Sequence, residues 1–148
     1  MAVTAKLYGG FVTALCNKEI DWNSDSIKAM LTTNTYVPDQ DTHDYENDVT
    51  NEVTGTGYSA GGVTLANCTI TYTGATNKLK LDADDASWAS STITLPANGS
   101  VVVYDGTPGT DATRPLVCYQ TTDTAVSTTA GTFTIQWHVD GIVEFTLG

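Results

Sequence analysis

Carboxylates are the most abundant groups in this chain that could do chemistry. The sequence has 17 Asp and Glu against 6 Lys and Arg. Closely spaced acids form two clusters: Asp39, Asp41 and Asp44, and Asp82, Asp84 and Asp85. Facing carboxylates with different pKa values could hydrolyse a glycoside, and clustered carboxylate oxygens could hold Ca²⁺. The spacing does not favour calcium, because the twelve-residue loop with its central Gly and final Glu is missing in both clusters. Helix capping and a solvated turn explain the acids better, so we predict no metal site.

Other catalytic groups are scarce. His43 and His138 are the only histidines, and neither has a nucleophile at a recognisable spacing. No GxSxG, HExxH, P-loop or GxGxxG pattern occurs. We therefore predict no catalytic residue, no cofactor and no enzymatic activity, with a carboxylate hydrolase as the weakest alternative.

The cysteines and the charge restrict the environment and the partners. Cys16, Cys68 and Cys118 form no CxxC pair, so we predict buried free thiols in a protein made in a reducing cytoplasm, without a secretory signal. The net charge of −11 repels phosphate, so we predict no binding to nucleic acid or to anionic membranes. The same charge keeps a protein soluble at high copy number.

Aromatic residues supply the candidates for a contact surface. Trp137 is in phase with the apolar residues of its strand, which favours the core. Trp22 and Trp88 follow polar turns and are either core edges, interface anchors or platforms for a sugar. The predicted interface residues are Trp22, Trp88, Tyr8, Phe11 and Arg114. The loops 105–113 and 121–131 and an extended N-terminal arm are candidates for reaching partners, with plain solvated connections as the alternative.

The elements that would position these residues are mainly strands. The 27 Thr, the frequent Val, Ile and Tyr and the 13 Gly are typical of strands joined by turns. Alternation predicts about eight strands, and the apolar run 101–104 predicts one that is covered on both faces. Apolar spacing and capping residues predict short helices over 10–18 and 43–50. Asp140-Gly141 predicts a hairpin. We expect one domain over 1–148, an antiparallel, jelly-roll-like β-sandwich in which 1–20 form the N-terminal arm and a short helix.

Several segments together resemble a widespread group of small virion proteins of tailed bacteriophages. The segments that carry the resemblance span nearly the whole chain: 17–21, 25–31, 38–44, 51–62, 82–85, Trp88, 92–94, 102–104 and 115–117. Leu95-Pro96 departs from the continuing strand expected there and could shorten that strand or place it at an edge.

The resemblance implies a function without catalytic residues. We expect a head decoration (cement) protein on the capsid surface of the virion, made in the bacterial host cytoplasm. Its partners would be the major capsid protein and copies of itself, as a homotrimer. A tail or baseplate structural protein is the nearest alternative, and a carbohydrate or host-surface binding module comes next.

Overall fold

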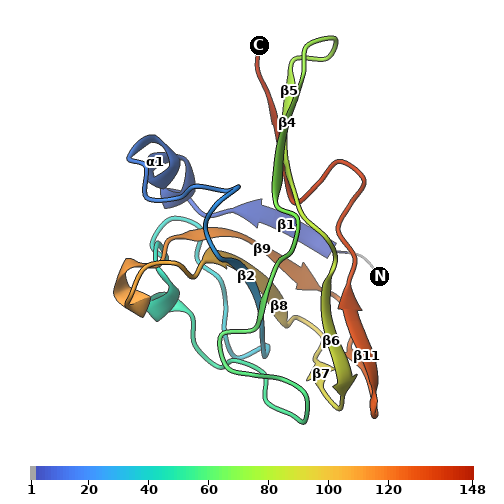
Figure 1. Ribbon diagram of the computed structural model, residues 1–148. Coiled ribbons are helices and arrows are strands. Elements are labelled where there is room, and N and C mark those ends of the chain that lie inside the picture. The colour runs from blue at the N-terminus through green and yellow to red at the C-terminus, as the bar shows by residue number, and fades with distance from the viewer. Residues whose placement is uncertain (1–2) are drawn as a thin grey trace.

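A five-stranded antiparallel sheet forms the centre of the protein (Figure 1). The computed structural model describes residues 3–148. The strands follow the order β1 (Val3–Leu7), β9 (Leu116–Thr122), β8 (Ser100–Asp105), β2 (Ile27–Thr32) and β3 (Val63–Thr64). All the neighbours in this sheet pair antiparallel.

Both faces of the central strand β8 are covered, as its apolar run predicts. All six of its residues are buried. Val101 and Val103 belong to the large core cluster on one face. Val102 and Tyr104 belong to a smaller cluster on the other face, together with Tyr36. The segment between β2 and β3 therefore supplies part of the cover on the second face.

Two short strand pairs form a second layer over the large core. They are β6 (Ala86–Ser91) with β11 (Gly131–Ile135), and β7 (Thr94–Leu95) with β10 (Val126–Ser127). Trp88 and Phe133 pack edge to face, with ring centroids 5.9 Å apart, and both belong to the large core cluster. The predicted mainly β, antiparallel, sandwich-like fold with a short helix near the N-terminus is confirmed. We call these two layers, with the segments that cover them, the body.

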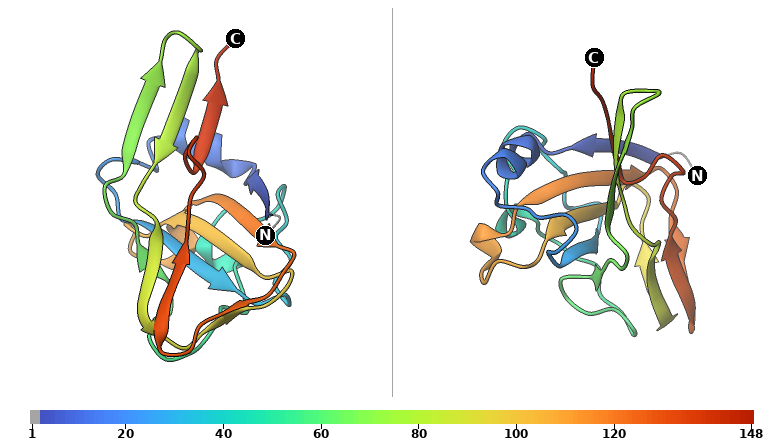
Figure 2. Two further views of the ribbon diagram at one scale, coloured as in Figure 1. Left: turned by 90° about the vertical axis from the view of Figure 1, so that its right-hand side faces the viewer. Right: turned by 45° about the horizontal axis from the view of Figure 1, so that its top comes forward.

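A third sheet projects from the body. It consists of β12 (Val143–Thr146), β5 (Lys78–Asp82) and β4 (Thr69–Thr73) in that order, and we call it the projecting sheet. Figure 2 shows its outer end extending beyond the body in both views. Strand β5 continues through a short turn into β6, and β11 leads into β12, so two neighbouring strands pass from the body into the projecting sheet.

One predicted helix is confirmed and the other is wrong. Helix α1 spans Gly10–Cys16, within the predicted 10–18. The segment predicted as a helix over 43–50 holds only the 3₁₀ turn η1 (Glu46–Asp48). Tyr45 is extended and pairs with Pro115, and the carboxylate of Asp48 accepts the amide of Tyr45 at 3.1 Å. The neighbouring strand thus holds the backbone where the helix would have begun. A second 3₁₀ turn, η2, spans Asp111–Thr113.

The predicted N-terminal arm is extended, but it is not free to reach a partner. Residues 3–7 form β1 and pair along their whole length with β9, in a register that sets Leu7 opposite Cys118. Residues 1 and 2 of the predicted arm lie outside the described residues.

The predicted hairpin at Asp140-Gly141 is half right. A tight turn forms, in which Gly141 donates to the carbonyl of His138 at 2.8 Å. The flanking strands do not pair with each other, because β11 pairs with β6 and β12 pairs with β5. Gly141 has φ +89°, and a Cβ there would lie 2.7 Å from the carbonyl oxygen of Leu81. The turn therefore redirects the chain from the body into the projecting sheet.

Candidate interaction surface

One face of the projecting sheet is apolar, and the strand registers show why. Ile70, Leu81 and Val143 lie opposite one another across the three strands. One repeat further along, Tyr72, Leu79 and Phe145 do the same. Side chains at alternate positions of a strand point to the same face, so these six residues share one side of the sheet.

The body covers only the base of this apolar face. The ring of Phe11, from helix α1, stacks on Phe145 with centroids 6.3 Å apart. Leu81 is 2 % exposed, whereas Ile70 is 45 % exposed and Tyr72 is 55 % exposed. The apolar surface therefore continues beyond its cover on β4, the outer strand.

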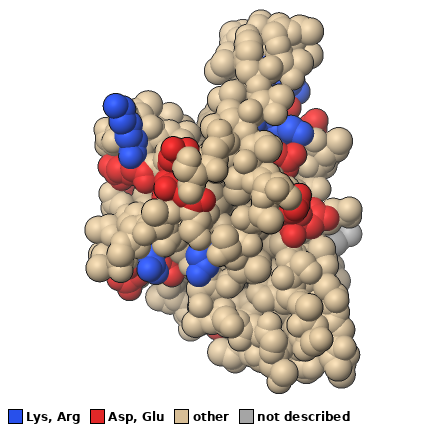
Figure 3. Space-filling view, in the orientation of Figure 1, with Lys and Arg blue, Asp and Glu red and all other residues tan. Residues whose placement is uncertain are grey.

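The opposite face of the projecting sheet is polar and carries ion pairs. Lys78 lies 2.7 Å from Glu144, and Lys80 lies 3.0 Å from Asp82. The hairpin from residue 69 to residue 81 contains two Lys and no carboxylate, although the whole chain has a net charge of −11. In Figure 3 the upper part of the projecting sheet is free of charged side chains on the face in view. This hairpin therefore adds no negative charge of its own to the surface of the protein.

Two buried tryptophans fix the base of the projecting sheet. The indole N–H of Trp22 donates to the carbonyl of Asp82 at 3.1 Å, and that of Trp137 donates to the carbonyl of Asp84 at 3.0 Å. The amide of Trp137 also donates to the carboxylate of Asp85 at 2.9 Å. The turn between β5 and β6 is therefore held by hydrogen bonds to the core, which limits bending of the projecting sheet.

Four of the five predicted interface residues are buried inside the chain, so the prediction of exposed anchors is wrong for them. Trp22 and Tyr8 are 1 % exposed, Phe11 is 0 % exposed and Trp88 is 5 % exposed. Their aromatic surface fills the protein's own core, although Trp22 and Phe11 do support the projecting sheet from beneath. For Trp22 and Trp88, which follow polar turns, the alternative of a place in the core is the correct one.

Arg114, the fifth predicted residue, is partly exposed and already has partners. Its guanidinium lies 2.8 Å from the carboxylate of Glu46 and donates to the carbonyl of Pro108 at 2.7 Å. These contacts join the loop 105–113 to η1. In the second predicted loop, Val126 and Ser127 pair with β7. Both loops are therefore anchored to the body.

Sequence reasoning missed Ile70 and Tyr72, which are the exposed apolar residues of the projecting sheet. Their alternation with Thr is the pattern of any half-buried strand. It therefore does not reveal that no other segment covers these two apolar side chains. The available signal was composition, because the five residues of β4 include no charge, Pro or Gly.

The acidic clusters act as hydrogen-bond acceptors for nearby main chain and side chains. The carboxylate of Asp39 accepts the amides of Asp41 and Thr42 at 2.9 and 3.2 Å. Asp84 accepts the side-chain amide of Asn67 at 2.7 Å. Within residues 3–148 no group of three or more His, Cys, Asp or Glu side chains is placed to hold a metal ion.

Asp105, at the end of β8, is a buried carboxyl group. Its side chain is buried, and one carboxylate oxygen accepts the amide of Thr107 at 2.8 Å. The other oxygen has no hydrogen-bond partner in the described part of the chain. Burial is the main reason why the pKa of Asp105 is raised to about 6, and the nearby Asp25 carboxylate adds to the rise. This group responds to pH in the weakly acidic range.

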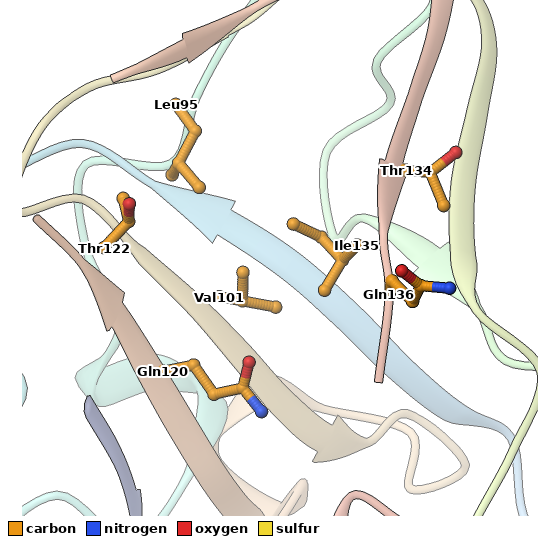
Figure 4. A pocket seen from close by; sticks show the side chains of 7 residues that line it. All are labelled: Leu95, Val101, Gln120, Thr122, Thr134, Ile135 and Gln136. Atoms are coloured by element: carbon orange, nitrogen blue, oxygen red, sulfur yellow. The ribbon is translucent and has the colours of Figure 1, made fainter. Parts of the chain in front are cut away.

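An open pocket of about 310 Å³ lies between the central sheet and β11. Figure 4 shows its lining residues: Leu95, Val101, Gln120, Thr122, Thr134, Ile135 and Gln136. The apolar side chains come from both layers, and the amides of Gln120 and Gln136 add neutral hydrogen-bonding groups. None of these lining residues is charged or aromatic. The pocket could hold a small neutral group, but its lining contains no general acid or base.

The histidines and cysteines have ordinary structural surroundings. His43 stacks on Tyr36 with ring centroids 5.5 Å apart and lies 3.0 Å from its hydroxyl, whereas the side chain of His138 is 72 % exposed. All three cysteines are free, but the prediction that each is buried holds only for Cys118, because Cys16 is exposed and Cys68 is partly exposed.

Comparisons with known proteins found no matching family model, no matching curated protein and no matching solved structure. Among the described residues, no helix has both the length and the apolar character needed to span a membrane.

Proposed function

We propose that this protein is a non-catalytic structural subunit that decorates the capsid of a tailed phage and uses the projecting sheet as a contact surface. One observation carries the proposal: the apolar face of a fixed, standing sheet is left uncovered at Ile70 and Tyr72. Apolar surface that is raised away from the core and bounded by polar residues is typical of sites that bind another protein.

The rigid base supports the same function. Trp22 and Trp137 hold the turn at the foot of the sheet, so little conformational freedom is lost when the sheet binds. A copy that makes modest contacts to several neighbouring subunits at once would bind a shell strongly, because these contacts reinforce one another through multivalency. The specific role in head decoration rests on the sequence resemblance, which also suggests the major capsid protein and further copies, as a trimer, as partners.

Imaging of purified phage particles by cryo-electron microscopy tests this function. We expect density for the protein at regular lattice positions on the capsid. Density confined to the tail would favour a tail or baseplate protein instead, and particles that lack the protein would reject both roles. A carbohydrate-binding module gains no support from the structure, because Trp22 and Trp88 are buried.

A pair of variants identifies the surface that binds the shell. Tyr72→Glu places a charge on the apolar face of the projecting sheet, and Val126→Glu places one on a 37 % exposed residue of the loop 121–131. We expect Tyr72→Glu to lower the occupancy of the shell and Val126→Glu to leave it unchanged. The reverse result would assign the contact to the loop.

A further inference from the structure

The outer edge of the projecting sheet is an unprotected strand. All nine residues from 69 to 77 are exposed, and in the described chain β4 pairs only with β5. Natural proteins usually protect a free edge with a Lys, a Pro, a bulge or a covering segment, because a bare edge invites another strand. The strand Thr69–Thr73 has none of these side chains and pairs with β5 in an unbroken register.

The pairing pattern shows which main-chain groups are free. Leu147 donates to the carbonyl of Asn77 at 2.7 Å, so alternate residues of β5 starting at Asn77 direct their main chain toward β12. The residues between them bond to β4 through Thr71 and its alternate neighbours. The amides and carbonyls of Ile70 and Tyr72 therefore point outward, toward solvent.

The sequence of β4 is complementary to itself. It reads Thr-Ile-Thr-Tyr-Thr, with Thr71 at the centre. In an antiparallel pair of two such strands centred on Thr71, Ile70 of each copy lies opposite Tyr72 of the other. The outward amides and carbonyls of these residues then bond to each other, and none remains free. Ile–Tyr pairs lie on the apolar face and Thr–Thr pairs on the polar face, and both kinds of cross-strand pair are favourable.

Charge also favours a second copy at this edge. Two molecules with a net charge of −11 repel each other over most of their surfaces. The hairpin 69–81 has no acid, and its two Lys are paired with Glu144 and Asp82, so close approach of two chains meets less repulsion here than at an acidic surface.

We propose that β4 pairs antiparallel with β4 of a second copy around a two-fold axis at Thr71, which joins two projecting sheets into one continuous sheet. This inference depends on the proposed function in taking the projecting sheet as a contact surface, and it names the partner at its edge. The pairing strand contributes five residues from each copy. A stable interface has roughly 20–30 residues a side, so we expect weak, concentration-dependent association in solution. On a shell, the high local concentration would favour the pair.

Substituting Thr71, which lies on the proposed two-fold axis, by residues of either charge tests the proposal. In Thr71→Glu the new carboxylate lies opposite Lys80 within its own sheet, which supports the fold, but faces its own copy across the axis. We expect Thr71→Glu and Thr71→Lys each to raise the dissociation constant by on the order of tenfold or more, because like charges lie directly opposite across the axis. Thr71→Lys also lies opposite Lys80 in its own sheet, so its circular dichroism spectrum should first be matched to that of the wild type. A mixture of the two variants should recover association as a heterodimer. Analytical ultracentrifugation of the full chain measures these constants.

Thr73→Glu is the matched control. It makes the same chemical change on the same strand and face, beside Lys78, but it lies opposite Thr69 of the other copy. We expect it to retain most of the association. Hydrogen exchange should also protect the amides of Ile70 and Tyr72 more strongly as the protein concentration rises.

Several outcomes would overturn the pairing. The first is a wild-type chain that stays monomeric at about 1 mM, which is the order of the effective concentration on a lattice. The second is a dimer that Thr71→Glu leaves intact. The third is a closed trimer in which the amide of Tyr72 exchanges freely. Each of these results leaves the decoration role standing, because that role is tested by the position of the protein on the particle. Conversely, a two-fold dimer that is absent from virions would reject the decoration role alone.

Discussion

The body and the projecting sheet use the same kind of strand in opposite ways. In the body, β8 is covered on both faces and each of its six residues is buried. In the projecting sheet, β4 alternates Thr with Ile and Tyr, yet each of its five residues is exposed. Burial in the body therefore stabilises the fold, whereas the exposed strand of the projecting sheet adds little to it, and substitutions should separate the two regions.

The largest effect is expected for a core residue of the body. Leu31 on β2 is 0 % exposed and belongs to the large core cluster. Leu31→Ala removes buried apolar surface and leaves a cavity, so we expect it to lower the free energy of unfolding by about 2–5 kcal/mol. Urea denaturation followed by circular dichroism measures the change. A loss below about 1 kcal/mol would show that this layer repacks easily and would weaken the contrast between the two regions.

A second prediction addresses the joint between the regions. Trp22→Phe keeps an aromatic ring but removes the donor to the carbonyl of Asp82, so we expect a loss of about 1–3 kcal/mol. Hydrogen exchange in residues 69–82 should accelerate. Trp88→Phe is the matched control, because Trp88 is also buried but its indole N–H has no partner in the described chain. Equal effects of the two variants would mean that the hydrogen bond at the base does not fix the sheet.

The third prediction uses the buried carboxyl of the body. Because the pKa of Asp105 is about 6 in the folded protein and 3.8 for an unperturbed Asp, the folded state binds the proton more tightly. The stability linked to this group is therefore fully present below about pH 4 and is lost as the pH rises through about 6. Asp105→Asn removes this loss, so the variant should exceed the wild type by on the order of 1–2 kcal/mol at pH 7.

Melting curves between pH 4 and pH 8 check the Asp105 prediction. The gain in Tm from Asp105→Asn should shrink toward pH 4, where Asp105 is protonated in the folded wild type. Asp123→Asn, at an exposed loop position, should give no gain that depends on pH in this range. A constant difference at every pH would assign the effect of Asp105→Asn to packing rather than to ionisation.

The smallest effect on stability is expected in the projecting sheet. Ile70 is 45 % exposed, so Ile70→Ala should change the free energy of unfolding of dilute protein by no more than about 0.5 kcal/mol. The same variant should weaken self-association, because it shortens the side chain opposite Tyr72 of the second copy. A loss of stability as large as that of Leu31→Ala would end the distinction between the two regions.

The strands of the body could be predicted from the sequence, whereas the placement of the projecting sheet could not. The run from Val101 to Tyr104 predicts a doubly covered strand because nearly any fold must bury it on both sides. The alternation at Ile70 and Tyr72 predicts a strand equally well, but local pattern does not say which face another element covers. The helix predicted over 43–50 does not form, because Tyr45 pairs with Pro115, which is far away in the sequence; this is a tertiary effect.

The candidate surface was harder to predict than the fold. Trp22 and Phe11 are predicted interface residues, and both are buried. Their role is indirect, since they contact Asp82 and Phe145 and so support the exposed sheet from its base. Residue type alone does not distinguish a side chain that contacts a partner from a buried side chain that supports the contacting strand.

The passage of two strands from the body into the projecting sheet has a mechanical consequence. Hydrogen bonds in an antiparallel pair lie perpendicular to the strands. A force applied to the projecting sheet along its strands is transmitted to the strand pair β6 and β11. It loads the hydrogen bonds of this pair in shear, so they must break together. A pull across the sheet would instead open the bonds one after another. Resistance to force should therefore depend strongly on direction and be greatest along the strand axis.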